Sequence, residues 1–392
     1  MHRLNVGGPT YHATYLTKYL NKSKFETRLY SGNIDQSEKD GEYILQEHGV
    51  VPIYVPHMFR KFNPIKDFRA FLFLVQEIRR FKPDIFHSHA SKAGAIGRIA
   101  AYICGVPVII HTYHGNVFSN YWGSFTSAGV RAIEKFLGLL TDRIIVISDL
   151  QFNEIVDKHK ICKKEKASII YLGLDLMKFN DIVSEKIDHS HTILNKGKEE
   201  YAIGIIGRLD PVKNHNLFLE MIAISKKISN KHIRGYIIGD GALRESLEKK
   251  CDDLKLKHSY KNSKDPKTDI VFLSWQNDLT TILPGLDVLA LTSFNEGTPV
   301  SLLEGQAARL PVISTDVGGV RDIIVPHKLN QIVEGFDPVD FANALLKIIK
   351  NLEKYNRPDN AKILKNFHYK RLINDIEKLY YDEIEKRRMD KK

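Results

Sequence analysis

Short runs of three to six residues, most of them largely apolar, alternate along the chain with longer stretches in which apolar residues recur every three or four positions. The runs lie at residues 84–89, 107–111, 143–148, 202–206, 235–238, 270–273, 287–291 and 312–314. Such runs are typical of parallel strands buried on both faces, and the stretches between them are typical of covering helices. The pattern therefore predicts an α/β fold with parallel sheets.

A polar, highly charged segment interrupts this alternation near residues 177–200, and the alternation then restarts. We therefore predict a first domain over residues 1–180, a linker over 181–200, a second domain over 201–366 and a last helix over 367–392. A chain of 392 residues is long enough for two such domains. The last helix has one apolar face that should dock on a domain, formed by Leu372, Ile373, Ile376, Leu379, Tyr380 and Ile384.

The first strand expected in the first domain is abbreviated. A glycine-rich turn at residues 5–9 leads into a helix-like run over residues 11–20, and only a few residues stand before the turn. A strand usually has about 5–6 residues, and a central strand without its start leaves neighbouring strand edges unpaired. We therefore hypothesise that the native protein starts upstream of Met1.

Composition excludes several classes of protein. Hydrophobic residues make up 43% of the chain and charged residues 27%, which is typical of a globular protein and not of a disordered one. The longest nearly apolar stretch, residues 99–110, is about half the length of a membrane span. Three cysteines without a Cys-x-x-Cys pair argue against a disulfide framework or a thiolate zinc site and favour the cytoplasm.

The strongest candidate site follows the run at residues 287–291. A loop of Gly297, Thr298 and Pro299 is expected there to lead into a helix, with Pro299 in the first helical turn. Backbone N–H groups at a helix start bind phosphate well. Glu296 precedes the loop, and Glu304 lies far enough into the helix to reach a ribose diol. Taken alone, the two glutamates fit equally well a purely structural interpretation, in which one is an acidic residue at a helix start and the other a solvated side chain.

Two cations form a second candidate site. Arg208 and Lys213 follow the run at residues 202–206, which opens the second domain. Cations at the carboxyl end of a parallel strand can neutralise a diphosphate, because open α/β sheets bind ligands at that edge. Two cations in a loop are more commonly just solvent-exposed side chains. The pair therefore indicates a diphosphate site only in combination with Glu296 and Glu304.

Motifs along nearly the whole chain resemble one family. The second half has Gly-Arg-Leu-Asp-Pro-Val-Lys-Asn at 207–214, Ile-Gly-Asp-Gly at 238–241, Glu296 with Glu304, and Val-Gly-Gly-Val-Arg-Asp at 317–322. The first half has Gly-Gly-Pro at 7–9, His-Ser-His-Ala at 87–90, His-Thr-Tyr-His-Gly at 111–115 and Leu-Gly-Leu-Asp-Leu at 172–176. The chain resembles the retaining glycosyltransferases of family four, the group 1 glycosyl transferases. This resemblance implies the GT-B fold, with two facing Rossmann-like domains and a C-terminal helix that crosses back to the first.

The resemblance also implies roles for residues of the second domain. Arg208 and Lys213 would hold the donor diphosphate and stabilise it as it leaves. Glu304 would bind the donor ribose, and Glu296 would contact the transferred sugar with the backbone of residues 297–299. Here the sequence departs from the family, because Glu304 is followed by Gly-Gln-Ala in place of the more usual Ala-Met-Ala. The departure keeps the carboxylate.

Five further residues receive roles from the resemblance. His114 would reach the sugar from the first domain, and Gly7 and Gly8 would let the backbone approach the diphosphate closely. Trp275 and Gln276, which follow the run at residues 270–273, would lie near the nucleotide base.

The implied reaction moves a hexose or N-acetylhexosamine from a nucleotide-diphosphate sugar, expected to be a UDP-sugar, to a glycan or lipid-linked glycan. Bacterial surface polysaccharide assembly, of capsule or lipopolysaccharide, is the implied setting. The chain has no Asp-x-Asp, the metal-chelating motif of other sugar-nucleotide transferases, so we expect a metal-independent reaction without a cofactor. Two enzymes of the same fold remain alternatives: a disaccharide phosphorylase and a sugar-nucleotide epimerase.

Four histidines define an alternative of another class, a metal-dependent hydrolase that uses His87, His89, His111 and His114. Against it, the chain has no acidic residue between Asp84 and Glu134 to complete a catalytic metal site. A nucleic-acid binder is also disfavoured, because no zinc-finger, RNP-like or recognition-helix motif is present.

The positive charge suggests where an acceptor could be found. The net charge is +11, and residues 1–180 hold 24 of the 58 lysines and arginines against 16 of the 47 acids. Residues 57–82 are basic and rich in phenylalanine, as expected of a segment that lies on an anionic bilayer. The phenylalanines could instead dock a helix on the first sheet. We expect peripheral contact with the inner face of the cell membrane.

Overall fold

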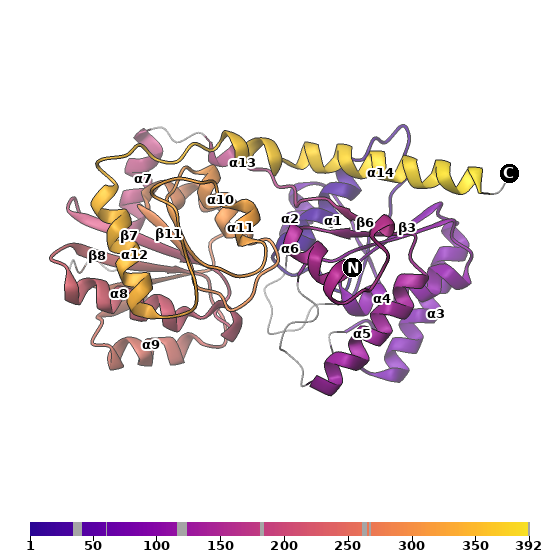
Figure 1. Cartoon of the computed structure of the whole chain (residues 1–392), viewed down its shortest axis with the longest axis horizontal. Helices are drawn as coiled ribbons and strands as arrows, with labels where there is room; N and C mark the ends of the chain where they lie inside the picture. Colours follow the sequence, from indigo (N-terminus) through magenta and orange to yellow (C-terminus); the bar gives the residue numbers. More distant parts are fainter. Residues whose placement is uncertain are drawn as a thin grey trace. The chain divides into compact units, whose positions relative to one another are not determined.

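The computed structural model describes residues 1–33, 41–59, 61–115, 124–180, 184–260, 265 and 268–390. The chain forms two compact units (Figure 1). The first unit joins Met1–Leu174 to Phe367–Lys392, and the second unit is Asp175–Asn366. Each unit is built from parallel strands with helices on both faces, which confirms the predicted α/β class.

The first unit contains a four-stranded parallel sheet in the order β3-β4-β5-β6 and a separate parallel pair, β1-β2. Its strands are β1 Tyr30–Ser31, β2 Ile53–Tyr54, β3 Ile85–His89, β4 Val108–Thr112, β5 Arg143–Val146 and β6 Ala167–Ile169. Its helices are α1 Gly8–Tyr19, α2 Glu42–Glu47, α3 Pro64–Phe81, α4 Ser91–Ile103, α5 Ser124–Leu139, α6 Asp149–Phe152 and α14 Tyr369–Met389, with the short η1 Asn153–Lys158 and η2 Lys164–Lys166.

Helix α14 docks on the first unit through the face predicted from its spacing. Leu372, Ile376 and Tyr380 are buried in one core with α1 and with the strand residues Val108 and Ile110. Arg371 also donates to the carbonyl oxygens of Tyr171 and Leu172 at 2.7 and 2.8 Å. The last helix therefore returns to the first unit, as the resemblance implied.

The second unit is built on a seven-stranded parallel sheet in the order β13-β12-β11-β7-β8-β10-β9. Its strands are β7 Glu200–Ile206, β8 His232–Ile238, β9 His258–Tyr260, β10 Ile270–Ser274, β11 Val288–Leu291, β12 Val312–Thr315 and β13 Gln331–Val333. Its helices are α7 Ser184–Leu194, α8 His215–Ile228, α9 Arg244–Asp253, α10 Val300–Ala307, α11 Val320–Ile323, α12 Pro338–Asn351 and α13 Ala361–Asn366. Four short helices complete it: η3 Met177–Phe179, η4 Pro211–Lys213, η5 Leu279–Thr281 and η6 Leu283–Gly285.

The segment predicted as a linker, residues 181–200, is for the most part integral to the second unit. Helix α7 occupies Ser184–Leu194 and buries Ser190 and Leu194. A Cβ atom added to Gly285 of η6 would lie 2.8–2.9 Å from these two side chains, so the contact is close. The helix buries a small polar residue beside a leucine, which explains why its sequence lacks a continuous apolar stripe.

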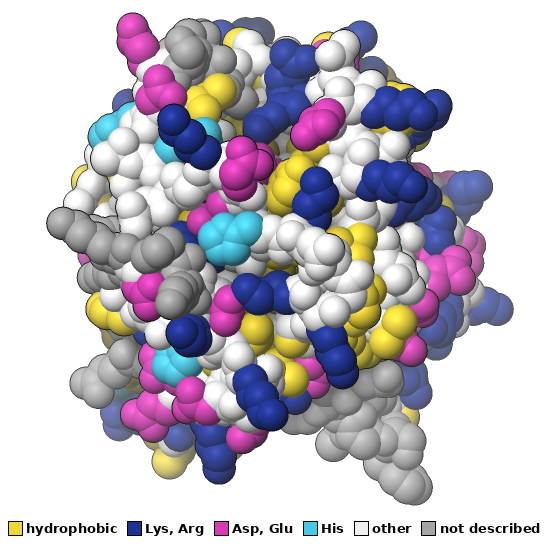
Figure 2. Space-filling model, turned by 90° about the vertical axis from the view of Figure 1, so that its left-hand side faces the viewer, with side chains coloured by type: hydrophobic (Ala, Val, Ile, Leu, Met, Phe, Trp, Pro, Cys, Tyr) yellow, Lys and Arg dark blue, Asp and Glu magenta, His cyan; other side chains and the backbone are white. Residues whose placement is uncertain are grey.

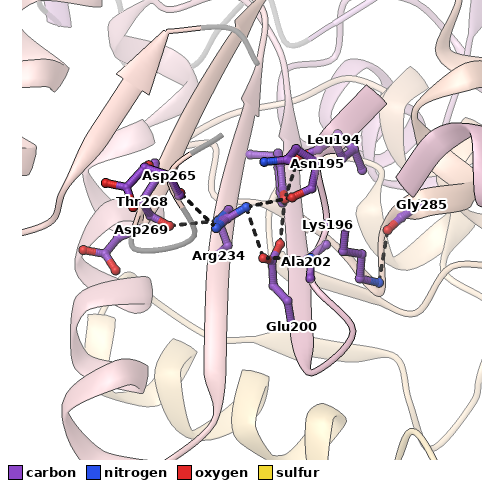
Figure 3. A network of polar contacts seen from close by, with 12 residues as sticks. Leu194, Asn195, Lys196, Glu200, Ala202, Arg234, Asp265, Thr268, Asp269 and Gly285 are labelled. Carbon is purple, nitrogen blue, oxygen red and sulfur yellow. Dashed lines mark hydrogen bonds and ion pairs between the residues drawn. The ribbon is translucent and has the colours of Figure 1, made fainter. Parts of the chain in front are cut away.

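A buried ion pair joins the amino ends of the central strands in the second unit (Figure 3). Arg234 on β8 lies 3.1 Å from the carboxylate of Glu200 on β7, and both side chains are almost fully buried. Arg234 also donates to the carbonyl oxygens of Thr268 and Asn195 at 2.8 and 3.2 Å. The Tyr236 hydroxyl donates to Glu200 at 2.6 Å. These bonds tie the end of α7 to the sheet.

Two further expectations concern the whole chain. Cys104, Cys162 and Cys251 are free thiols, as the absence of a paired spacing predicted. Among the helices that the structure describes, none combines the length and apolarity that crossing a membrane requires.

Candidate active site

The candidate residues of the second unit follow three strands of its parallel sheet. Arg208 and Lys213 follow β7, Trp275 and Gln276 follow β10, and residues 296–299 follow β11. Because the strands are parallel, all three loops leave the same edge of the sheet, where open α/β sheets bind their ligands. The sequence-predicted residues of this unit therefore share one edge.

Lys213 and Glu296 form an ion pair between two of these loops. Lys213 Nζ donates to Glu296 Oε1 at 2.7 Å, and Ser293 Oγ donates to the same oxygen at 2.6 Å. The loops are also joined through their backbones, because Phe294 N donates to Val212 O at 2.8 Å. Both side chains of the ion pair are partly exposed, at 24% for Lys213 and 11% for Glu296. A cation and a carboxylate, each with defined partners, thus lie together at the sheet edge.

Arg208 lies near this pair in sequence but has a partner of its own. Its Nε donates to Asp210 Oδ2 at 2.7 Å, and its side chain is 37% exposed. The following strand reaches this loop very closely, because a Cβ atom on Gly239 would lie 2.0 Å from Gly207 O. Gly239 also has φ 143°, which favours glycine. The Ile-Gly-Asp-Gly motif thus packs under the Arg208 loop.

Helix α10 begins one residue later than predicted. Pro299 is the N-cap, with an extended conformation at φ −70° and ψ 111°, and the first helical residue is Val300. Pro299 is thus not a first-turn residue, since its ψ directs the chain into the helix from an extended loop. Thr298 beside it is buried.

Sequence reasoning missed Ser293 and Gly318 as parts of this site. Gly318 has φ 55°, and a Cβ atom there would lie 1.9 Å from Glu296 O. Gly319 N donates to Gly297 O at 2.8 Å, so the loop after β12 supports the Glu296 loop from behind. The Val-Gly-Gly motif at 317–319 is the sequence feature that indicates Gly318. The hydrogen bond from Ser293 has no such feature, because it depends on the path that the loop takes.

Glu304 lies on α10 and is half-buried. Burial raises the pKa of its carboxyl group to about 7, while nearby Lys178 acts in the opposite direction. A carboxyl group with this pKa is present in both protonation states near neutral pH. It can therefore accept hydrogen bonds from hydroxyl groups as the anion.

The two residues predicted near a nucleotide base follow β10 directly. Gln276 Nε2 donates to Leu273 O at 2.7 Å, which holds this side chain against the strand end. Trp275 is half-buried beside it.

The candidate residues of the first unit lie in two places. Gly7 is the N-cap of α1, with φ 156°, and Gly8 is the first residue of that helix. His114 follows β4, and its Nε2 lies 2.9 Å from His89 Nδ1.

The histidines proposed as a metal site divide into two environments. His111 bonds Ser88 at 2.8 Å and packs on the Tyr113 ring, whereas His87 bonds the Tyr380 and Thr112 hydroxyls. Over the described ranges, no group of three or more His, Cys, Asp or Glu side chains is arranged to hold a metal ion. The structure therefore gives the hydrolase alternative no support.

His12 of α1, which the sequence did not single out, joins the cluster instead. Its ring centroid lies 5.3 Å from that of His89 and 5.0 Å from that of His114. Burial lowers the pKa of His87 and of His114 to about 3. His114 is therefore a neutral imidazole near pH 7, suited to hydrogen bonding and not to charge neutralisation.

Two family models match this chain. The model described as "Glycosyl transferases group 1" matches residues 186–365, and the model described as "Glycosyltransferase Family 4" matches residues 6–178. Together they cover the parallel strands of both units.

Curated relatives and solved structures agree with these matches. An Escherichia coli protein named UDP-Gal:alpha-D-GlcNAc-diphosphoundecaprenol alpha-1,3-galactosyltransferase is 31% identical over 341 residues, which cover 86% of this chain and 85% of that protein. The Staphylococcus aureus capsular polysaccharide biosynthesis glycosyltransferase CapM is 26% identical, over 85% and 83% of the two chains. The crystal structure of Anabaena Alr3699/HepE in complex with UDP has a TM-score of 0.76 at 16% identity, over 96% of each chain.

Proposed function

We propose a function for this chain from one premise: it belongs to the family 4 glycosyltransferases, and its second unit is a group 1 glycosyl transferase domain. The fold is GT-B, and the chain is a glycosyltransferase. The proposed reaction transfers a hexose or N-acetylhexosamine from a UDP-sugar to a lipid-linked glycan in bacterial polysaccharide assembly. The E. coli relative, which is named for UDP-galactose and a diphosphoundecaprenol acceptor, supports both substrate classes.

The observation that carries this proposal is the Lys213–Glu296 pair at the carboxyl edge of the second sheet. In the proposed mechanism, Lys213 and Arg208 bind the donor diphosphate, and Glu296 turns to the hydroxyls of the transferred sugar. Both cations neutralise negative charge as it develops on the leaving diphosphate, where preorganised charge lowers a barrier most. The reaction then needs no metal ion or other cofactor.

The proposed stereochemistry is retention. The acceptor hydroxyl oxygen bonds to the anomeric carbon on the face from which the diphosphate departs. The bond from that carbon to the diphosphate oxygen breaks, and the departing phosphate takes the hydroxyl proton. Glu304 binds the ribose, Trp275 and Gln276 lie by the base, and residues 297–299 support the sugar. From the first unit, Gly7 and Gly8 contact the diphosphate, and neutral His114 bonds the sugar.

The test of the donor site is a thermal shift of the purified protein in EDTA with UDP, GDP, ADP, CMP or inorganic phosphate. A ligand at a hundredfold excess over its Kd stabilises the folded state by about 2.7 kcal/mol. We expect UDP to raise the melting temperature of the wild type and to have little effect on Glu304→Ala. The matched control is Glu220→Ala on α8, whose carboxylate pairs with Lys250 on the helical layer.

Each other outcome of this measurement selects an alternative. Stabilisation by phosphate alone, unchanged in Glu304→Ala, would favour the disaccharide phosphorylase. Stabilisation by UDP without sugar release to any acceptor would favour the epimerase. A thermal shift with UDP that appears in a parallel scan with Mg²⁺ and is absent in EDTA would contradict the metal-independent mechanism.

The exposed surface of α3 supports the membrane part of the proposal. Phe62, just before the helix, and Ile65, Phe68 and Leu72 on it recur at three- and four-residue spacing and are 81%, 70%, 60% and 50% exposed. The opposite side of the helix buries Ala70, Leu74 and Ile78. Phe71 and Phe73 pack partly on this core, so the docking interpretation holds for them and not for Phe62 and Phe68.

Cations accompany this exposed stripe. Lys61, Lys66 and Arg69 are exposed on the same segment, an arrangement suited to the surface of an anionic bilayer. On the face of the second unit shown in Figure 2, by contrast, cationic and acidic side chains are interspersed. We propose that the protein works at the inner face of the cell membrane and contacts it through α3.

Flotation with liposomes that contain phosphatidylglycerol tests this contact. At low salt the wild type should float with the vesicles, because each basic side chain near the surface contributes about 1 kcal/mol. Phe62→Ser combined with Phe68→Ser should leave most of the protein in the soluble fraction. Phe336→Ser, at an exposed position of the second unit, is the control. A wild type that stays soluble would refute the contact.

A further inference from the structure

The backbone of His114 is held on both sides. Tyr113 N, before it, donates to Ile145 O of β5 at 2.9 Å, and the carbonyl oxygen of Gly115, after it, accepts from Gln151 Nε2 at 2.8 Å. Gln151 is a buried residue of α6. The main chain at His114 is thus fixed by β5 and α6, so the direction of its ring depends on the side chains around it.

The first of these side chains is His89. Its Nδ1 lies 2.9 Å from His114 Nε2, and the two ring centroids are 5.1 Å apart. His89 is buried at the end of β3, and the His87 ring packs on it with a centroid distance of 4.3 Å. His87 itself bonds hydroxyl groups through both of its ring nitrogens. A ring that is fixed at both nitrogens therefore supports His89, and His89 in turn supports His114.

The second of these side chains is His12 of α1. It is fully buried, and its ring meets the rings of His114 and His89 edge to face, with interplanar angles of 82° and 63°. An edge-to-face contact depends on the orientation of both rings. A hydrogen bond from one neighbour and a ring contact from the other thus restrict the rotation of the His114 side chain.

The hydrogen bond between His89 and His114 also restricts the tautomer of each ring. Burial, followed by the neighbouring His87, lowers the pKa of His89 well below its ordinary value, and burial lowers the pKa of His114 to about 3. Both rings are therefore neutral near pH 7, and a neutral imidazole has one N–H donor and one acceptor nitrogen. Because one of the two bonded nitrogens must donate and the other accept, the remaining nitrogen of His114, Nδ1, takes a single role.

Nδ1 is the polar atom of His114 that is left for a ligand. It is buried, and no residue that the structure describes gives it a hydrogen-bond partner. A buried polar atom costs free energy unless it is hydrogen-bonded. A sugar hydroxyl suits this nitrogen in either tautomer, because a hydroxyl group can both donate and accept.

We propose that His89 is a positioning residue of the transfer reaction: it holds His114 in one ring orientation and one tautomer, so that His114 Nδ1 bonds a hydroxyl of the transferred sugar. His12 supports this orientation through its ring contacts. The inference rests on the proposed function, in which His114 bonds that sugar. Because UDP carries no transferred sugar, a change at His89 should affect the reaction of the UDP-sugar and leave the binding of UDP unchanged.

Two amide substitutions at His89 test the positioning role. In His89→Asn the polar amide atoms are attached to Cγ, as Nδ1 is, so the bond to His114 Nε2 can be kept. In His89→Gln they lie one bond further along the side chain, and this bond should be lost. We expect His89→Gln to lower kcat/KM for the UDP-sugar by about tenfold, which corresponds to one hydrogen bond, and His89→Asn to recover most of this loss. UDP should raise the melting temperature of all three proteins equally. Equal kcat/KM of the two variants would overturn the positioning role.

The tautomer of His114 is measured without catalysis. Nitrogen-15 spectra of histidine-labelled protein near pH 7 distinguish the two neutral tautomers, and the His114 signals are those missing from His114→Asn. We expect one tautomer in the wild type and in His89→Asn, and a mixture in His89→Gln. A mixture in the wild type would overturn the inference even if the rates behave as expected. A wild type without turnover would contradict the proposed function, and the spectra would still decide whether His89 fixes His114.

Discussion

Lys213→Met is expected to lower turnover by about a hundredfold to a thousandfold, the range seen when one preorganised hydrogen-bond donor to a transition-state charge is removed. Lys213 is held in place at this edge, because its Nζ bonds Glu296 and its backbone oxygen accepts from Thr292 Oγ1 at 3.1 Å. Methionine keeps the unbranched stem and removes the charge. The loss should fall on kcat more than on KM, because charge accumulates on the diphosphate as the bond breaks.

The measurement is the rate of UDP release from the UDP-sugar with acceptor present, together with the melting temperature. Stability should change by only about 1 kcal/mol, because Glu296 keeps its bond from Ser293. Lys250→Met is the control, since Lys250 also pairs with a glutamate, Glu220, at 2.6 Å but lies on the helical layer. Turnover that stays within twofold of wild type would remove Lys213 from the mechanism.

The long strands could be predicted from sequence because they are buried on both faces. All eight apolar runs correspond to strands of the structure, such as residues 202–206 within β7 and 312–314 within β12. The strands without a prediction have only two or three residues, and most of their residues are partly exposed, as in β2 and β6. Such short strands carry little of the apolar signal on which the prediction depends.

The residues of the candidate site could be predicted from the sequence, but which of their side chains bond to each other could not. Arg208, Lys213 and Glu296 each follow an apolar run, so their place at one sheet edge follows from topology. That Lys213 bonds Glu296 while Arg208 bonds Asp210 depends on the course of each loop. His12 was missed for a related reason: it joins the histidines from the helix α1, and no spacing in the sequence links it to β3.

Arg234 is the residue for which sequence reasoning was least informative. A positive charge near the start of a strand is ordinarily exposed, yet Arg234 is 1% exposed and bonds Glu200. Its partners come from two segments that are distant from it in the chain, one with Asn195 and Glu200 and one with Asp265 and Thr268, shown together in Figure 3. A charge can be buried here only because each of these segments supplies an acceptor.

Removing this cation is expected to give the largest loss of stability. Arg234→Met should lower the free energy of unfolding of the second unit by about 3–5 kcal/mol, because it leaves the Glu200 carboxylate buried without its counter-charge. The Tyr236 hydroxyl still donates to that carboxylate, which limits the loss. Urea denaturation followed by circular dichroism measures the change, with Arg321→Met at the exposed Asp316 pair as the control that should behave as wild type.

A double variant separates the buried charge from the lost packing. Glu200→Gln alone should also destabilise the unit, whereas Arg234→Met combined with Glu200→Gln should recover part of the loss, because a neutral amide costs less to bury than an unpaired carboxylate. At temperatures where the variants remain folded, UDP should stabilise them as it does the wild type, since Arg234 lies at the amino ends of the strands and the donor site at their carboxyl ends. A double variant less stable than the sum of the single losses would show that the arginine stem, and not the ion pair, holds α7 to the sheet.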